Sequence, residues 1–252
     1  MLKIGLCGCN GRMGKVITDI VSKKENMQIV AGFDAYTEKL ADYPVYADPH
    51  EFTGACDVII DFSNVSSLDM LLDYCVKTKT PVIFCTTGYD KEQLAKIREA
   101  SAVIPVFRSG NMSIGINLMM DLLRKAATVL GDGYDVEITE KHHNQKLDAP
   151  SGTALALADS MNEALDEAYT YTYDRSQKRQ KRDKYEIGIS AVRGGNIVGE
   201  HEVIFAGQDE VIEFKHTAYS KAVFAKGAVE AAKFLKGKPA GHYDMADVIA
   251  AK

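Results

Sequence analysis

Short, almost continuously apolar runs alternate with amphipathic stretches over the first 110 residues. The apolar runs occupy 2–8, 27–34, 56–62, 80–88 and 104–110, while 13–24, 66–78 and 90–101 carry apolar residues at helical spacing. Continuous apolarity is typical of parallel strands that helices cover on both faces. The alternation therefore predicts βαβ units with right-handed crossovers in an α/β, doubly wound parallel sheet.

The pattern changes after a helix-like stretch at 114–130. The segments 134–143, 185–194, 197–207 and 210–218 alternate apolar with polar residues, as half-buried strands do. This pattern predicts a second, α+β domain. The last long stretch, 220–239, is an amphipathic helix that Gly237 and Pro239 end.

Composition indicates an ordinary globular protein. The 252 residues are 46% hydrophobic and 26% charged, enough for one large or two smaller domains. No apolar run approaches the roughly 20 residues that cross a bilayer, and the first glycines come too early for a signal peptide, so we expect a cytoplasmic protein with no membrane partner. The net charge of −5 argues against a general nucleic-acid binder.

Two features could indicate a binding site, but ordinary structure explains each of them better. The five cysteines form no C-x-x-C pair and mostly lie in apolar stretches, so reduced, buried thiols are expected rather than disulfides or zinc. The segment 174–184 carries six basic residues without interleaved glycines or aromatics. A solvated, mobile loop is favoured there over a phosphate site.

A glycine-rich turn follows the first predicted strand. Gly8, Gly11 and Gly14 give G-x-x-G-x-x-G, and a helix-like stretch follows. Such a turn lets a pyrophosphate approach the backbone and rest on helix amides, which indicates a Rossmann-like dinucleotide site. Asp34 lies at the end of the second strand, where its carboxylate can accept hydrogen bonds from ribose hydroxyls and repel a 2′-phosphate.

The cofactor prediction depends on the charges near Asp34. Ala35 supplies no guanidinium to offset the carboxylate, whereas Arg12 and, more weakly, Lys39 could reach a 2′-phosphate. We expect NADH to be accepted at least as well as NADPH.

The segment 140–154 concentrates candidate chemistry. His142 and His143 are neighbours in a predicted strand, so they point to opposite faces and are poorly placed to bind one metal ion. Lys146 and the turn before a helix at 153–163, with the Thr153 hydroxyl, complete a donor-rich pocket suited to a small dicarboxylate. Imidazole and ammonium groups could act there as general acids. Asp148 is expected to cap the turn or pair with Lys146.

These motifs resemble the dihydrodipicolinate reductase family of lysine and diaminopimelate biosynthesis. The resemblance covers nearly the whole chain and rests on GCNGRMG at 8–14, DFS at 61–63, CTTG at 85–88, NMSIGIN at 111–117, EKHHNQKLDAPSGTA at 140–154, VRGGNIVGEHEVIF at 192–205 and GHYDMADVI at 241–249. The histidine motif is the longest and most specific of these.

The resemblance implies hydride transfer from NAD(P)H to a cyclic dicarboxylate, giving tetrahydrodipicolinate. It implies that His142 is the general acid, that Lys146 assists as a second proton donor, and that His143, Gly152 and Thr153 bind a substrate carboxylate. The implied cofactor contacts are Gly8, Cys9, Asn10, Gly11, Arg12, Met13, Asp34, Cys85, Thr86, Thr87, Ser109, Gly110, Asn111 and Met112.

The resemblance also implies two domains and a homotetramer. Residues 1–112, completed by 219–252, would bind the dinucleotide, and 113–218 would bind substrate and form the tetramer through an open mixed sheet. Two positions depart from the family pattern. Cys85 stands where glycine is common, and Ala35 stands where some members carry arginine, which argues against tight NADPH selectivity.

Two other functions remain as alternatives. A semialdehyde dehydrogenase needs a cysteine in its catalytic domain, yet every cysteine lies at or before Cys85; homoserine dehydrogenase is a related candidate. A non-catalytic NAD(H) sensor would explain the glycine turn and Asp34 but would leave His142 without a role.

Overall fold

The computed structural model describes residues 1–251 and divides into two compact units. Unit 1 comprises Met1–Ser113 and Ala222–Lys252, and unit 2 comprises Ile114–Lys221. The chain thus leaves unit 1 after its first 113 residues and returns to it at residue 222.

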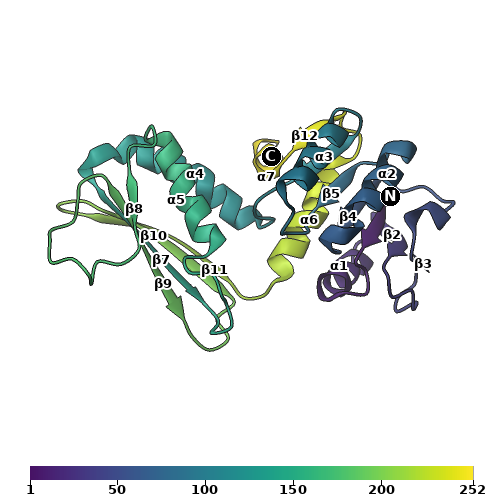
Figure 1. Cartoon of the computed structure of the whole chain (residues 1–252), viewed down its shortest axis with the longest axis horizontal. Helices are drawn as coiled ribbons and strands as arrows, with labels where there is room; N and C mark the ends of the chain where they lie inside the picture. Colours follow the sequence, from purple (N-terminus) through teal and green to yellow (C-terminus); the bar gives the residue numbers. More distant parts are fainter. Residues whose placement is uncertain (252) are drawn as a thin grey trace. The chain divides into compact units, whose positions relative to one another are not determined.

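Unit 1 contains a seven-stranded sheet in the order β12-β6-β5-β4-β1-β2-β3, with every neighbouring pair parallel (Figure 1). The strand order reverses direction at β1, which confirms the predicted doubly wound sheet. The strands are β1 Leu2–Cys7, β2 Met27–Phe33, β3 Val45–Tyr46, β4 Val58–Asp61, β5 Val82–Phe84, β6 Pro105–Arg108 and β12 Gly241–Tyr243.

Helices cover both faces of this sheet. Ile59 and Ile60 are successive residues of β4, so they point to opposite faces, and both are fully buried. Helix α6 packs beside α1, and α2 packs beside α3. The helices of unit 1 are α1 Arg12–Ser22, α2 Leu68–Thr78, α3 Lys91–Ser101, α6 Ala222–Leu235 and α7 Met245–Ala250, with short 3-10 turns η1 Pro49–Glu51 and η2 Val65–Ser67.

Unit 2 contains a five-stranded mixed sheet, as predicted for the second domain. Its order is β11-β10-β7-β9-β8, in which β7, β8 and β9 run parallel and β10 is antiparallel to both neighbours. The strands are β7 Asp135–His142, β8 Thr170–Thr172, β9 Glu186–Arg193, β10 Gly199–Ala206 and β11 Val211–Ala218; the helices are α4 Ile114–Leu130 and α5 Gly152–Ala164, with the 3-10 turn η3 Gly131–Gly133.

One face of the unit 2 sheet forms the core with α4 and α5. Val136 and Ile138 of β7 and Val203 of β10 are buried against Leu123 and Leu157 of the two helices. The same face continues along β7 to Glu140 and His142, which are also buried. The apolar core therefore ends where the polar residues of the histidine segment begin.

The loop at 174–184 is largely exposed, as predicted, but two of its arginines are held by ion pairs. Arg175 binds Glu137 and Glu186, with nitrogen to oxygen distances of 2.6 and 2.7 Å. Arg182 binds Glu137 and also donates to the carbonyls of Val136 and Glu186. These contacts hold the loop against the face of the sheet that is opposite to α4 and α5. Glu186 can be buried on β9 because the arginines neutralise its charge.

All five cysteines are free, and each is buried or partly buried, as predicted. Within the part of the chain that the structure describes, no helix has the length and apolar character needed to cross a membrane.

Candidate active site

The glycine turn joins β1 to α1 and leaves no room for side chains. Gly8 has φ +71°, and a Cβ there would lie 2.5 Å from the Phe62 carbonyl oxygen. A Cβ on Gly14 would overlap the carbonyl oxygens of Gly8 and Cys9. These glycines therefore allow the backbone to fold tightly at the N-terminus of α1.

The N-terminus of α1 is suited to an anion. Gly11 is the N-cap residue, no side chain among the described residues caps the helix, and its first turn contains no acidic residue. The amides of the first turn and the helix dipole consequently favour a phosphate group.

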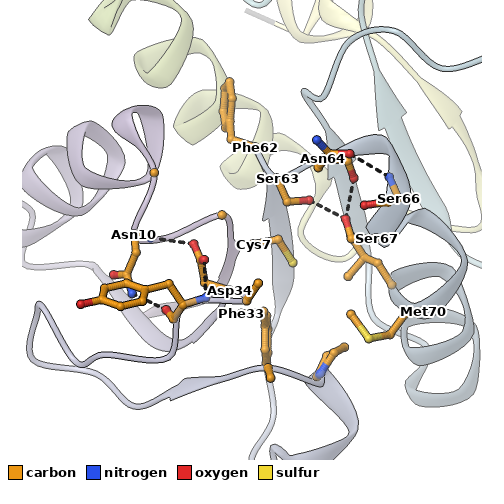
Figure 2. Close-up of a pocket in the computed structure, with 17 residues that line it drawn as sticks. Cys7, Asn10, Phe33, Asp34, Phe62, Ser63, Asn64, Ser66, Ser67 and Met70 are labelled. Atoms are coloured by element: carbon orange, nitrogen blue, oxygen red, sulfur yellow. Dashed lines mark hydrogen bonds between the residues drawn. The ribbon is translucent and has the colours of Figure 1, made fainter.

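Asp34 is held beside this turn. Its carboxylate accepts hydrogen bonds from the backbone amides of Asn10 and Tyr36, each at 3.0 Å (Figure 2). The Asn10 side chain donates to the carbonyls of Tyr36 and Glu38. Asp34 therefore lies at the end of β2 with its carboxylate fixed next to the glycine turn, as the motif predicts.

A cavity of about 490 Å³ opens at this place. Figure 2 shows Asp34, Asn10 and Phe33 on one side and Ser63, Asn64, Ser67 and Met70 on the other. The volume lies in the range of small-molecule sites. Four of the predicted cofactor residues, Gly8, Asn10, Gly11 and Asp34, line this cavity together.

The other predicted cofactor residues occupy neighbouring positions. Cys9 lies in the turn and is buried, whereas Arg12 and Met13 begin α1; none of the three lines the cavity. The segments Cys85–Thr87 and Ser109–Met112 follow β5 and β6 directly. Because the carboxyl ends of parallel strands meet at one edge of a sheet, these segments lie along the same edge as Gly8.

A buried carboxylate, Asp61, connects the ends of β4 and β5. It accepts hydrogen bonds from Ser63, from Thr86 Oγ1 at 2.9 Å and from the Tyr89 hydroxyl at 3.2 Å. Burial raises the pKa of Asp61, although the hydrogen bonds oppose this shift. Asp61 thus fixes the CTTG segment, since Thr86 is one of its donors.

Together these features fit a nicotinamide dinucleotide. Gly8 and Gly14 let the turn fold tightly where any Cβ would clash with backbone, α1 presents amides without a side-chain cap for a pyrophosphate, and Asp34 lines the cavity where it could accept from a ribose.

In unit 2, His142 is held by the buried carboxylate of Glu140. His142 Nδ1 lies 2.7 Å from Glu140 Oε2, and Arg193 donates to both oxygens of Glu140 at 2.7 and 2.6 Å. Burial alone would raise the pKa of Glu140, but the hydrogen bonds from Arg193 and His142 outweigh it and lower the pKa.

The turn before α5 is attached to the same carboxylate. The amide of Ser151 donates to Glu140 Oε1 at 2.9 Å, and Ser151 Oγ caps α5 by accepting from the amide of Ala154. Ser151 Oγ also lies 3.0 Å from His201 Nε2. Burial lowers the pKa of His201 to about 4, so His201 is neutral at pH 7.

The remaining predicted residues surround this turn. Gly152 and Thr153 form the first turn of α5, and Gly152 is exposed. Lys146 Nζ lies 2.7 Å from Asp148 Oδ1, which confirms the predicted pairing, and this hydrogen bond lowers the pKa of Asp148. His143 follows the end of β7, and its Nδ1 is buried without a hydrogen-bond partner among the described residues.

The arrangement can deliver protons beside an anion site. His142 Nε2 is directed away from Glu140, while Lys146 supplies an ammonium group and α5 supplies amides at its N-terminus. Among the side chains that the structure describes, no group of three or more His, Cys, Asp or Glu residues could hold a metal ion.

Sequence reasoning gave no role to several residues of these two sites. Glu140 could have been noticed because it shares a strand face with His142 at a spacing of two. Arg193 and His201 could not be linked to it, since they come from other strands whose register the sequence does not specify. Ser63 belongs to the DFS motif, and Asn64 and Ser67 follow it, but none of the three was assigned to the cofactor site.

The comparisons with known proteins agree along the whole chain. The family profile "Dihydrodipicolinate reductase, N-terminus" matches residues 2–112, and "Dihydrodipicolinate reductase, C-terminus" matches residues 115–249. A 4-hydroxy-tetrahydrodipicolinate reductase of Clostridium tetani is 51% identical over 97% of this chain and 96% of its own length. The Clostridium novyi protein of the same name is 50% identical over all of both chains.

A solved structure gives the same fold. The dipicolinate-bound dihydrodipicolinate reductase from Paenisporosarcina sp. TG-14 is 24% identical, covers 97% of each chain and has a TM-score of 0.77. Both halves of the sequence thus match one family over their full length, and the chain belongs to the dihydrodipicolinate reductase family of nicotinamide-dependent oxidoreductases.

Proposed function

We propose that this reductase transfers hydride from NAD(P)H to 4-hydroxy-tetrahydrodipicolinate with loss of water, or directly to its dehydrated form, to give tetrahydrodipicolinate, and that His142 supplies the accompanying proton. The observation that carries the proposal is the hydrogen bond between His142 Nδ1 and Glu140, which leaves Nε2 as the nitrogen able to donate. A buried imidazole held in this way is typical of a general acid.

Unit 1 binds the dinucleotide through its glycine turn. The amides at the start of α1 donate hydrogen bonds to the pyrophosphate, and Asp34 accepts hydrogen bonds from the ribose. Cys85–Thr87 and Ser109–Met112 form the remaining edge of the site. When bound, the nicotinamide cofactor supplies the hydride, and the residues of the chain supply orientation and protons.

Unit 2 binds the cyclic dicarboxylate. Gly152 and Thr153 offer the first amides of α5 to one carboxylate, and His143 adds a further contact. Reduction of a conjugated imine places negative charge on the ring nitrogen and the neighbouring carbon. A proton from His142, with Lys146 as a second donor, neutralises that charge.

NADH is expected to serve at least as well as NADPH. The Asp34 carboxylate repels a 2′-phosphate, and the next residue, Ala35, offers no positive charge. Arg12 is exposed at the start of α1 and is the main opposing charge. The ratio of the two kcat/KM values measures which effect is larger.

The proposed function also includes an oligomeric state and a cellular location. We expect a homotetramer formed through the unit 2 sheet and a cytoplasmic location. Light scattering on the purified protein tests the first expectation, because a tetramer has four times the mass of the chain.

The decisive experiment supplies substrate made freshly from pyruvate and aspartate semialdehyde by the enzyme that precedes this step. Rapid, substrate-dependent oxidation of NADH or NADPH is the expected result. His142→Gln and Lys146→Ala should each lose turnover by roughly 100-fold or more while keeping nucleotide affinity.

Two outcomes would contradict the proposal. If the folded protein binds nucleotide but oxidises none, a non-catalytic sensor or another dehydrogenase becomes the better explanation. If Lys146→Ala abolishes nucleotide binding instead of turnover, Lys146 belongs to the nucleotide site and not to the substrate site.

A further inference from the structure

One fully buried carboxylate contacts both parts of the unit 2 site. Glu140 has no exposed side-chain surface. Its Oε2 accepts from His142 Nδ1, its Oε1 accepts from the amide of Ser151, and each oxygen also accepts from Arg193. A single side chain therefore joins the proposed proton donor on β7 to the turn that begins α5.

We propose that Glu140 is a positioning residue: it fixes the His142 imidazole with Nδ1 protonated, so that Nε2 exchanges the catalytic proton, and it holds the carboxylate-binding turn in register with that nitrogen. This inference rests on the proposed role of His142. Glu140 itself touches neither substrate nor cofactor.

The donor and acceptor capacities of the two side chains require that Nδ1 of His142 carries the hydrogen. An ionised carboxylate can only accept, so the ring nitrogen facing Glu140 must carry the hydrogen. The bidentate contact with Arg193 keeps Glu140 ionised despite burial. Gly199 leaves space at the other edge of the ring, since a Cβ there would lie 3.1 Å from His142 Nε2.

The titratable and charged groups around His142 come from four strands and one loop. Glu140 lies on β7, Arg193 on β9, and His201 on β10, with its ring centroid 5.1 Å from that of His142. Lys146 lies on the following loop, paired with Asp148, and His216 on β11 lies in register with His201. Among these groups, only Glu140 brings a negative charge into contact with the imidazole.

Glu140→Gln tests the proposal because glutamine keeps the shape of the side chain. The amide of Ser151 can only donate, whereas an imidazole can change from donor to acceptor by moving its proton. Arg193 donates to both oxygen positions of Glu140, so it favours neither orientation of the glutamine. The glutamine oxygen should therefore stay on the Ser151 side, and its NH₂ should face His142. His142 would then carry its hydrogen on Nε2 in the neutral form, which is a very weak acid.

The expected result separates proton transfer from binding. We expect Glu140→Gln to lower kcat by roughly 100-fold or more, while affinity for dipicolinate and for NADH changes little. The pH–rate profile of the residual activity should differ from that of the unchanged protein, because the proton donor is no longer held by Glu140. Unchanged kcat and an unchanged profile would overturn the proposal.

Glu137→Gln is the matched control. Glu137 lies on the same strand but on the opposite face, and it also binds two arginines, Arg175 and Arg182. This variant loses a structural carboxylate without touching His142, so its kcat and pH profile should remain those of the unchanged protein. An equal fall in kcat for both variants would show a general structural effect and overturn the specific role of Glu140.

If Glu140→Gln does not fold, a measurement on the unchanged protein can still test the role of Glu140. Nitrogen-15 NMR of the labelled imidazoles, with His142→Gln to assign the signal, should show His142 protonated at Nδ1 in its neutral form. A dominant Nε2-protonated form would overturn the proposal. This test needs no turnover, so it still decides the role of Glu140 if the reductase assay fails.

Discussion

Gly14 illustrates how the absence of a side chain can determine a binding site. In a helix, alanine is ordinarily more favourable than glycine by roughly 0.5–1 kcal/mol. Here a Cβ would overlap two backbone oxygens of the turn, and such overpacking costs about 1–3 kcal/mol or more. We therefore expect Gly14→Ala to lower stability and to weaken NADH binding by at least about tenfold.

Urea denaturation and NADH titration check this expectation. Gly133→Ala is the control, because a Cβ there meets no atom within 4 Å. Unchanged NADH affinity in Gly14→Ala would mean that the turn relaxes without losing its fit to the pyrophosphate.

The lowered pKa of the buried His201 imidazole makes the stability of the protein depend on pH. Its pKa in the folded chain is about 4, below the ordinary 6.5, because burial opposes the charged form. Between these values the unfolded chain binds a proton that the folded chain does not, so stability falls as pH decreases from 6.5 towards 4. The full loss from this group is about 3 kcal/mol.

Denaturation curves at pH 7, 6 and 5 measure this contribution. His201→Asn should show a weaker dependence on pH than the unchanged protein, by up to about 1.4 kcal/mol per pH unit. His242→Asn, at an exposed position on β12, should keep the original slope. Parallel curves for all three proteins would show that His201 is protonated equally in both states.

At the scale of elements, the loop at 174–184 contains two kinds of basic residue. Arg182 contacts two carboxylates and three backbone carbonyls, whereas Lys181 is exposed. Hydrogen bonds that involve charged groups contribute about 1.5–3 kcal/mol each, less at exposed positions. Arg182→Ala should therefore destabilise unit 2 by roughly 1–3 kcal/mol.

Lys181→Ala provides the comparison, since exposed substitutions usually change stability by less than about 0.5 kcal/mol. Hydrogen exchange of the amides in β7 and β9 reports on unit 2 directly. Equal protection of these amides in both variants would show that the contacts of Arg182 do not stabilise unit 2.

The sequence predicts the long elements because their patterns are strong. The alternation in β7, β10 and β11 and the apolar runs of β1 and β2 lead to the observed strands within one or two residues. The strands β3, β8 and β12 and the six-residue helix α7 were not predicted, because two to six residues carry too little periodicity. Their positions depend on neighbouring strands that complete the sheets.

At the scale of the whole molecule, the sequence predicts motifs better than the contacts between them. The glycine turn and Asp34 could be joined in advance because one βαβ unit brings them together. The contact of Glu140 with Arg193 spans 53 positions and depends on the register of β7 and β9. The ion pairs of Arg175 and Arg182 could not be foreseen for the same reason, since their carboxylate partners lie on other elements.

The return of the chain to unit 1 depends on a close contact at Gly227. Met112 stands just before the chain leaves unit 1, and Gly227 lies in α6 just after it returns. A Cβ on Gly227 would overlap the Met112 carbonyl oxygen. The helix therefore approaches this backbone more closely than any other residue would allow.

Gly227→Ala should have two opposing effects on stability, a gain in helix propensity and a steric clash with the Met112 carbonyl. Propensity alone would stabilise α6 by up to about 1 kcal/mol, but the overlapping atom is backbone and cannot rotate away, so a cost of about 1–3 kcal/mol or more is expected to dominate. Thermal denaturation should show a lower midpoint for Gly227→Ala, while the neighbouring exposed change Lys226→Ala leaves it nearly unchanged. A raised midpoint for Gly227→Ala would mean that α6 can move away from Met112, and that the closure of unit 1 does not depend on this contact.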